Sequence, residues 1–210
     1  MAFFDLEHIA ATLLQARTDQ RRFLVAIAGP PASGKSTLAE ALNDYLNGIE
    51  DLRSVVVPMD GFHLDNDRLD DLGLRHRKGA PETFDFEGFA HLLRRLRTSD
   101  QPIYYPTFDR SLDKAIAGQG VVNPDDQVVL VEGNYLLLDE KPWSQIKPLF
   151  DHSVFLNTPM DVLESRLIQR WLDHDHSPEE AKARALSNDI PNATRVCARS
   201  VKTDQSIDLI

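Results

Sequence analysis

Residues 29–36 read Gly29-Pro30-Pro31-Ala32-Ser33-Gly34-Lys35-Ser36, and this stretch decides the fold class. It matches G-x-x-x-x-G-K-[ST] at every defined position. The apolar run 23–28 precedes it and the amphipathic run 37–46 follows it, which predicts a strand, a loop and a helix in that order. In such a loop successive backbone N–H groups point at phosphate oxygens, and the helix adds the positive end of its dipole. A plain Gly/Pro turn would not require Lys35 and Ser36 at this offset, so the stretch predicts a nucleotide site.

We expect the loop to hold the phosphates of ATP, with Mg²⁺ beside them. Lys35 would place a cation between the outer phosphates, and the Ser36 hydroxyl suits the metal. The nucleotide contacts expected from the loop and the first helical turn are Gly29, Ala32, Ser33, Gly34, Lys35, Ser36 and Thr37. Taken alone, the loop indicates ATP or GTP and leaves open what is done with the nucleotide.

The rest of the chain alternates short apolar runs with helical patterns. Further strands are predicted at 54–59, 127–131, 153–156 and 205–210, and helices at 3–17, 86–96 and 159–173. Ser177, Pro178 and Glu180 carry the signature of a capping box, which predicts one more helix. This alternation favours an α/β fold with a mainly parallel sheet covered on both faces. Ligands of such sheets bind at the carboxyl ends of the strands.

Two acids directly follow predicted strands. Asp60 comes after 54–59 and Glu132 after 127–131, so both should stand at the same edge as the phosphate loop. Phosphoryl transfer needs one acid to take or orient the proton of an acceptor hydroxyl and another to hold Mg²⁺. Asp60 suits the first role and Glu132 the second. Either acid could instead cap the turn after its strand, above all Asp60, which precedes a glycine.

Length and charge exclude several function classes. At 210 residues the chain fits one domain, 1–210, and its 42% hydrophobic content suffices for a sizeable core. The 23 basic against 33 acidic residues give a net charge of −10, which disfavours partners such as nucleic acid or an anionic membrane. No apolar run approaches the roughly 18 residues of a membrane span. Cys197 is the only cysteine, so no intrachain disulfide forms and a reducing cytoplasm fits best. The sequence leaves open whether the protein forms a homodimer.

The order of the motifs resembles a known family. Residues 59–63 read MDGFH, 77–85 RKGAPETFD, 108–110 FDR and 131–135 VEGNY. Over about 23–170 the chain resembles the P-loop kinases that include uridine kinase, phosphoribulokinase and bacterial pantothenate kinase, and especially short bacterial proteins labelled fructose-transport-system kinases. The resemblance implies a three-layer P-loop NTPase sandwich with a five-stranded parallel core and a small mobile helical lid at about 159–192. It also implies that Asp60 activates the acceptor, with Lys35, Ser36 and Glu132 around ATP and Mg²⁺.

Departures from the family pattern bear on the acceptor. Uridine kinases carry an Asp where this chain has Gly79 and a His where it has Asp113, and both changes disfavour uridine. Pantothenate kinases of this type are longer at both ends, and their acceptor-side Tyr and His pattern is not clearly reproduced. Phosphoribulokinases need extra basic residues for a sugar phosphate, which Arg77, Lys78 and Arg110 could supply.

Seven residues lie in segments expected to rim the acceptor pocket: His63, Arg77, Lys78, Tyr104, Phe108, Asp109 and Arg110. Carboxylate and aromatic groups suit a neutral polyol, whereas Arg and Lys groups suit an anion, so the set does not decide the acceptor. Plainer interpretations stay open: a solvated charge pair for Arg77 and Lys78, a hydrogen-bonded histidine for His63, and packing for Tyr104.

Arg166 and Arg170 lie four apart on the predicted helix 159–173 and share a face. On a lid they would swing over ATP and stabilise charge on the transferring phosphoryl group, while closure would exclude water. They could instead bond acids on the surface. His174 and His176 indicate a solvated loop rather than a metal site. Residues 188–192 either border the adenine or end a helix.

We therefore expect a cytoplasmic kinase that uses ATP and Mg²⁺ to phosphorylate a hydroxyl of a small molecule. A sugar such as fructose is the preferred acceptor, only because the short bacterial proteins that this chain resembles are labelled fructose-transport-system kinases. Pantothenate or a nucleoside is the alternative within the class, and a nucleotide-dependent regulatory NTPase is the alternative from another class. The regulator would release phosphate without any acceptor, whereas a kinase would stay nearly silent until its acceptor is added.

Overall fold

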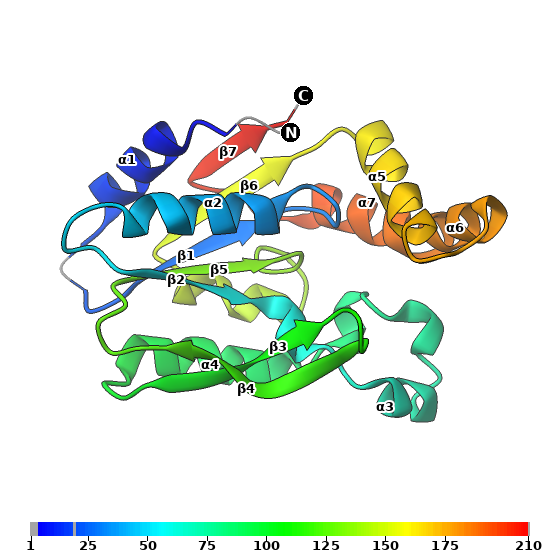
Figure 1. The fold of residues 1–210 in the computed structure, drawn as a ribbon, viewed down its shortest axis with the longest axis horizontal. Coiled ribbons are helices and arrows are strands. Elements are labelled where there is room, and N and C mark those ends of the chain that lie inside the picture. Colours follow the sequence, from blue (N-terminus) through cyan, green and yellow to red (C-terminus); the bar gives the residue numbers. More distant parts are fainter. Residues whose placement is uncertain (1–3, 19, 210) are drawn as a thin grey trace.

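Five strands form a central parallel sheet in the computed structural model, which describes residues 4–18 and 20–209. The strands lie in the order β2–β5–β1–β6–β7, with their carboxyl ends on one side of the molecule (Figure 1). Their bounds are β1 Phe23–Ala28, β2 Ser54–Pro58, β5 Val128–Gly133, β6 His152–Asn157 and β7 Gln205–Asp208. The parallel pairing confirms the predicted α/β sheet. Residue 210 of the predicted last strand and residue 3 of the predicted first helix lie outside the described residues.

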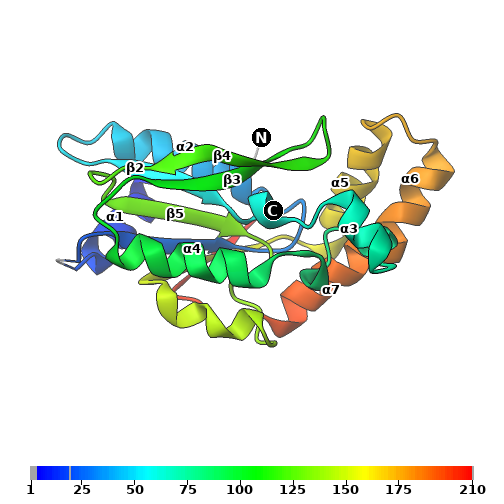
Figure 2. The same ribbon diagram turned by 90° about the horizontal axis from the view of Figure 1, so that it is seen from below.

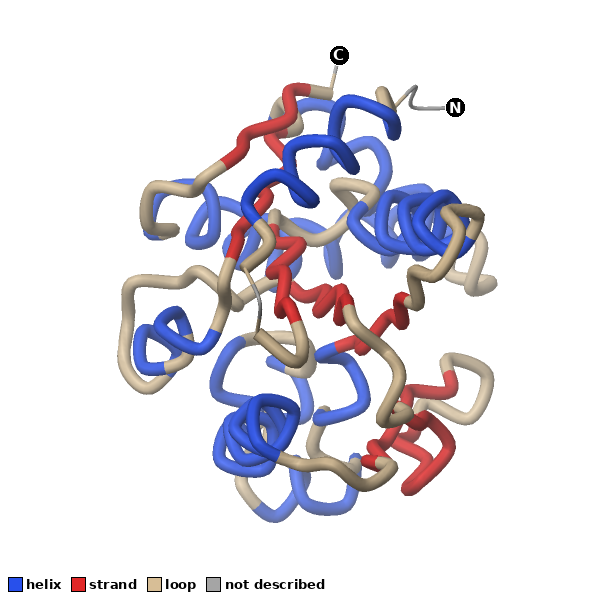
Figure 3. The backbone as a smooth tube through the Cα atoms, turned by 90° about the vertical axis from the view of Figure 1, so that its left-hand side faces the viewer, coloured by secondary structure: helices blue, strands red, loops and turns tan. Residues whose placement is uncertain are grey.

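Helices cover both faces of the sheet and make three layers, which Figure 3 shows from one end of the molecule. Phe23, Val25 and Ile27 of β1 face the layer formed by α1 (Leu6–Ala16) and α2 (Lys35–Asn47). The intervening side chains of β1 face α4 (Phe86–Thr98) on the other side. All six residues of β1 are buried, because a strand covered on both faces requires a continuous apolar run.

An antiparallel hairpin and a short helix have no counterpart among the predicted elements. The hairpin joins β3 (Ile103–Asp109) to β4 (Lys114–Val122), and α3 spans Asn66–Asp71. Figure 2 shows the hairpin running over the edge of the sheet, with α3 beyond one end. The Tyr105 hydroxyl donates to the carbonyl oxygen of Val56 at 2.8 Å, which ties the hairpin to β2.

The chain from 160 to 199 forms a helical segment beyond the carboxyl ends of the strands (Figure 1). It consists of α5 (Met160–Leu172), α6 (Pro178–Arg184), a π-helical turn (Ala185–Asp189) and α7 (Ile190–Arg199). Its buried apolar cluster contains Leu163, Leu167, Ala185 and Ala193. The capping box of Ser177 and Glu180 is confirmed. The interpretation of 188–192 as a helix stop is wrong, because the helix continues through the π turn into α7.

Strands β2, β5 and β1 are neighbours in the sheet, so the segments that follow them meet at one edge. These segments are the phosphate loop, a 3₁₀ turn at Met59–Phe62 and the loop after Gly133. The helical segment lies over the same edge (Figure 1). Among the described residues, no helix has the length and apolar character to cross a membrane.

Candidate active site

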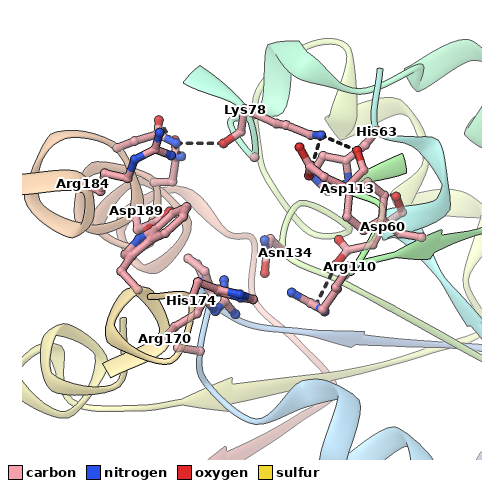
Figure 4. A pocket seen from close by; sticks show the side chains of 18 of the residues that line it. Asp60, His63, Lys78, Arg110, Asp113, Asn134, Arg170, His174, Arg184 and Asp189 are labelled. Atoms are coloured by element: carbon pink, nitrogen blue, oxygen red, sulfur yellow. Dashed lines mark hydrogen bonds and ion pairs between the residues drawn. The ribbon is translucent and has the colours of Figure 1, made fainter. Parts of the chain in front are cut away.

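A cavity of about 1030 Å³ lies at the carboxyl ends of the strands, between the sheet and the helical segment 160–199. Its walls come from the phosphate loop, the segments after β2 and β5, the turn of the β3–β4 hairpin, and the helical segment. Figure 4 shows Arg170 and Arg184 on the helical side, across from Lys78 and His63. In an α/β fold this edge is the expected position of a ligand site.

The phosphate loop presents an open helix N-terminus to the cavity. Gly34 has a φ of +96°, a conformation that favours glycine, and α2 begins at the next residue. No side chain of the described residues caps this helix, and Lys35, Ser36 and Thr37 of its first turn line the cavity. Free N–H groups and the positive end of the helix dipole make this position suitable for phosphate.

Lys35 and Glu132 place two buried charges at the cavity wall. The Lys35 ammonium donates to the carbonyl oxygen of Pro30 at 2.8 Å. Burial lowers the pKa of Lys35 to about 8, against the opposing charges of Glu132 and Asp60. Burial also raises the pKa of Glu132 to about 7, aided by Asp60 and opposed by Lys35 and the Ser36 hydroxyl. A phosphate would therefore favour the charged form of Lys35, and a metal ion the charged form of Glu132.

The donor set fits Mg²⁺ held together with nucleotide phosphates. Ser36 offers a hydroxyl and Glu132 a carboxylate, which are hard oxygen ligands. The described part of the chain contains no cluster of three or more His, Cys, Asp or Glu that could hold a metal ion without further ligands. A cation that keeps waters and phosphate oxygens as ligands matches this sparse set.

Asp60 lies in the 3₁₀ turn that follows β2 and faces the hairpin. Its Oδ2 atom is 3.3 Å from a terminal guanidinium nitrogen of Arg110. The Asp60 side chain is 28% exposed, so it can reach a molecule in the cavity. A carboxylate at this position can accept a proton from a bound hydroxyl.

His63 forms part of the same wall. Its ring lies between those of Phe84 and Phe108, with centroids 4.0 and 4.8 Å away. Its Nδ1 atom lies 2.9 Å from the carbonyl oxygen of Asp60, which can only accept, so Nδ1 carries the hydrogen. Burial lowers the pKa of His63, against the opposing effect of Asp60, so the neutral ring leaves Nε2 as a hydrogen-bond acceptor.

Every Arg and Lys on the hairpin side of the cavity is already paired. The pairs are Arg75 with Asp70 at 2.9 Å, Lys78 with Asp113 at 2.7 Å, and Arg110 with Asp60 at 3.3 Å. The Lys78 ammonium also donates to Asn66 Oδ1 at 2.7 Å and to the Asp113 carbonyl oxygen at 2.9 Å. An ammonium has three donors, and here all three are used. The three ion pairs on this side therefore have no net charge.

The helical side differs, because Arg170 and Arg184 form no ion pair with any residue that the structure describes. Burial lowers the pKa of Arg170, as does Arg110, while Asp189 and Asp60 raise it. The guanidinium of Arg184 lies 4.8 Å from the centre of the Trp171 ring. Two cations without carboxylate partners face the phosphate loop across the cavity. Anionic phosphates would complement them.

The structure brings most of the sequence-predicted site residues to this cavity. Those lining it are Ala32, Gly34, Lys35, Ser36, Thr37, Asp60, His63, Lys78, Phe108, Arg110, Glu132 and Arg170. Gly29 and Ser33 belong to the same loop but are buried behind its surface.

Four other predicted residues do not line the cavity, for local reasons. Tyr104 is 63% exposed, because the pleat of β3 turns the next tyrosine inward instead. Asp109 accepts hydrogen bonds from Ser111 and Leu112 and so stabilises the hairpin turn. Arg77 bonds Glu82 and Asn188. Arg166 donates to the carbonyl oxygen of Ala32 at 3.1 Å.

The sequence analysis missed several residues that line the cavity: Asp70, Arg75, His76, Asn134, Trp171 and Arg184. Asn188, Asp189 and Asn192 also line it, and they belong to the segment 188–192 that the sequence had singled out. Asn134 could have been found, because it follows Glu132 at a strand end. Arg75 and His76 belong to short turns whose position depends on the undetected hairpin and α3.

Comparisons with known proteins agree with this geometry. Residues 24–177 match the phosphoribulokinase / uridine kinase family. A proposed uridine kinase of Schizosaccharomyces pombe is 35% identical over 213 residues, which cover 97% of this chain and 88% of that protein. A pantothenate kinase of Limosilactobacillus reuteri is 28% identical over 171 residues, which cover 80% of this chain and 56% of that protein. The crystal structure of a proposed fructose transport system kinase from Silicibacter sp. TM1040 has a TM-score of 0.93 and 44% identity, covering 98% of this chain and 100% of that one.

Proposed function

This chain belongs to the phosphoribulokinase / uridine kinase family and is a small-molecule kinase. We propose that it transfers the γ-phosphoryl group of ATP, with Mg²⁺, to a hydroxyl of a neutral sugar such as fructose. One observation carries the proposal. A phosphate loop open to an anion faces Asp60 in one cavity, and every cation on the Asp60 side is already paired with a carboxylate.

The side chains divide the chemistry between them. The Asp60 carboxylate takes or orients the proton of the acceptor hydroxyl while the hydroxyl oxygen attacks the γ-phosphorus, the bond from that phosphorus to the bridging oxygen breaks, and ADP leaves. Lys35 and Arg170 offset the negative charge on the phosphoryl oxygens. Ser36 and Glu132 would hold Mg²⁺, which when bound neutralises charge on the phosphates. Closure of the helical segment 160–199 would act as a lid and keep water from the transferring group.

Charge favours a neutral acceptor over an anionic one. A carboxylate or phosphate on the acceptor needs a free Arg or Lys fork. On the hairpin side such an anion would have to compete with the carboxylate of one of three ion pairs, and it would lie beside that carboxylate, whose like charge repels it. A polyol instead can donate to Asp60 and to Nε2 of His63, with its carbons against Phe108. The name of the Silicibacter structure, at 44% identity, supports a sugar such as fructose.

A nucleoside is the second candidate, because it is also neutral and because the relative from Schizosaccharomyces pombe carries the name of a uridine kinase. Against it stand Gly79 and Asp113, at positions where uridine kinases have Asp and His. Pantothenate is an anion, which the paired cations of the hairpin side disfavour.

The test is ADP production from Mg²⁺-ATP with a panel of sugars, nucleosides, pantothenate and sugar phosphates, beside a control without acceptor. We expect D-fructose or another neutral sugar to raise turnover well above the control. Stimulation by pantothenate or a sugar phosphate alone would overturn the neutral acceptor. High turnover in the control that no acceptor raises would overturn the kinase and favour a regulatory NTPase.

A further inference from the structure

Asn188 joins the helical segment to the loop that carries Lys78. Its Nδ2 atom donates to the carbonyl oxygen of Lys78 at 2.9 Å, and its Oδ1 atom accepts from Arg77 at 2.9 Å. Both partners belong to residues 75–80, named here the acceptor loop. The side chain of Asn188 thus forms hydrogen bonds with the carbonyl of Lys78 and the guanidinium of Arg77, which lie 110 and 111 positions away in the chain. The buried Asn192 also donates to Asn188 Oδ1, at 3.3 Å.

The π turn is what places this residue. The N–H of Ile190 donates to the carbonyl oxygen of Ala185, five positions earlier, so the turn holds one residue more than an α-helical turn. Asn188 and Asp189 are adjacent in it and face different partners. While Asn188 binds the acceptor loop, Asp189 accepts from the Trp171 indole N–H at 2.6 Å. Trp171 belongs to α5, one residue after Arg170.

The acceptor loop continues this connection to the hairpin. The carbonyl of Lys78 binds Asn188, and its ammonium binds Asp113 at the hairpin turn and Asn66 at the start of α3. Figure 4 shows Lys78 between these two sets of contacts, with Asp113, His63 and Asp60 beyond it. A short series of hydrogen bonds therefore runs from α5, through the π turn and Lys78, to the wall that contains Asp60.

We propose that Asn188 is a positioning residue that couples the two halves of the cavity, so that a nucleotide bound against Arg170 also orders the acceptor loop. The inference rests on the proposed function in one respect, namely that ATP phosphates bind between the phosphate loop and the helical segment. Phosphates there would hold α5, α5 would hold Asp189 through Trp171, and Asn188 would then fix the carbonyl of Lys78. Such a coupling is reciprocal, so bound ATP would tighten binding of the acceptor and bound acceptor would tighten binding of ATP.

Amide hydrogen exchange tests the coupling without knowledge of the acceptor. The amides of Arg77, Lys78 and Ala80 donate to carbonyls within residues 74–77, so their exchange reports opening of the acceptor loop. The probe is Mg²⁺ with a non-hydrolysable ATP analogue, added to the full chain. We expect exchange in 75–80 to slow by about fivefold or more, the lower end of ordinary coupling between sites.

Variants separate coupling from loss of stability. In Asn188→Ala the analogue should still protect 29–37, while its effect on 75–80 disappears. Asn47→Ala is the matched control, because Asn47 also makes two hydrogen bonds, to Ser54, far from the cavity, and it should keep the full effect on 75–80. If Asn188→Ala does not fold, Arg77→Ala removes the other bond to Asn188 and should lose part of the effect.

The outcomes distinguish this inference from the proposed function. Protection of 29–37 without protection of 75–80 in the natural chain would overturn the coupling and leave the nucleotide site standing. Equal protection of 75–80 in the natural chain and in Asn188→Ala, or in Arg77→Ala where that variant replaces it, would overturn the role of Asn188. Absence of protection at 29–37 would overturn the nucleotide site and, with it, the coupling.

Discussion

The carboxylate of Asp60 and the guanidinium of Arg110 meet at 3.3 Å, although the two residues lie 50 positions apart in the chain. Asp60 follows β2 and Arg110 begins the hairpin turn, so the contact joins the sheet edge to the hairpin. The Arg110 side chain is 58% exposed, and ion pairs at that exposure contribute little to stability. Arg110 can therefore leave Asp60 at small cost when a hydroxyl takes its place.

Asp60→Asn should abolish most transfer and leave nucleotide binding nearly unchanged. The amide keeps the shape of the carboxyl group but cannot accept the proton of the acceptor, a loss of about 10²–10⁴-fold in rate. The measurements are the transfer rate and the calorimetric affinity for Mg²⁺-ADP. Asp71→Asn, an exposed acid on α3 paired with Arg68, is the control and should keep both. Near-normal transfer by Asp60→Asn would remove Asp60 from the role of base.

The affinity for Mg²⁺-ADP should rise as pH increases from about 6 to about 7 and level off towards pH 8, where Lys35, whose pKa burial lowers to about 8, begins to lose the proton that phosphate binding favours. Burial raises the pKa of Glu132 to about 7, so the unliganded protein holds a proton on part of Glu132 at neutral pH. A metal ligand must be deprotonated, so binding releases that proton and becomes easier at higher pH. Calorimetry in two buffers of different ionisation heat counts the protons. Glu132→Gln should weaken binding and flatten the pH dependence, and an unchanged slope in that variant would assign the proton to another group.

Arg170 and Arg166 should behave differently, although they share a helix face. Arg170→Ala removes a half-buried cation without a carboxylate partner from the cavity, so the transfer rate should fall by about 10²-fold or more. Arg166 does not line the cavity, and Arg166→Ala removes its bond to the carbonyl oxygen of Ala32, so we expect a loss below about tenfold. Steady-state kinetics with saturating ATP measures both. Equal losses would place Arg166 at the phosphates after lid closure.

These cases show what the sequence could predict and what it could not. Strands β1, β2, β5 and β6 and the phosphate loop follow from local patterns, because strands covered on both faces require apolar runs and the loop geometry is encoded in consecutive residues. The hairpin was missed because β3 contains Pro106 and β4 is mostly exposed, so neither strand shows a sustained alternation of apolar and polar residues. The hairpin is held by contacts distant in sequence, with the turn Met59–Phe62, with α4 and, through Tyr105, with Val56 of β2.

The sequence also does not show which side chains of a strand or helix face inward. Tyr104 and Tyr105 are identical residues on opposite faces of one strand, and no local signal decides which of them faces inward. Arg166 and Arg170 lie one helical turn apart, and only the position of α5 over the sheet decides which of them lines the cavity. The π turn adds one residue to a helix, and the sequence 185–189 carries no signature that predicts it.

Gly61→Ala should cost both stability and transfer. An added Cβ at Gly61 would overlap the carbonyl oxygen of Pro106 in the hairpin, so either the hairpin moves away or the turn that carries Asp60 shifts. Overpacking of this kind costs about 1–3 kcal/mol in the free energy of unfolding, measured by urea denaturation. Because a displacement of about 1 Å at a reacting group can cost about 10²-fold in rate, transfer should fall by more than the folded fraction does.

Gly48→Ala is the control for this variant, since the nearest atom to its added Cβ is a carbonyl oxygen at 3.2 Å at the end of α2, away from the cavity. It should keep normal transfer whatever its stability. If Gly61→Ala keeps both stability and rate, the close approach of hairpin and turn does not hold in solution. If stability falls while the rate per folded molecule stays normal, the hairpin alone has yielded, and Asp60 is held by β2 and its own turn rather than by the contact with Pro106.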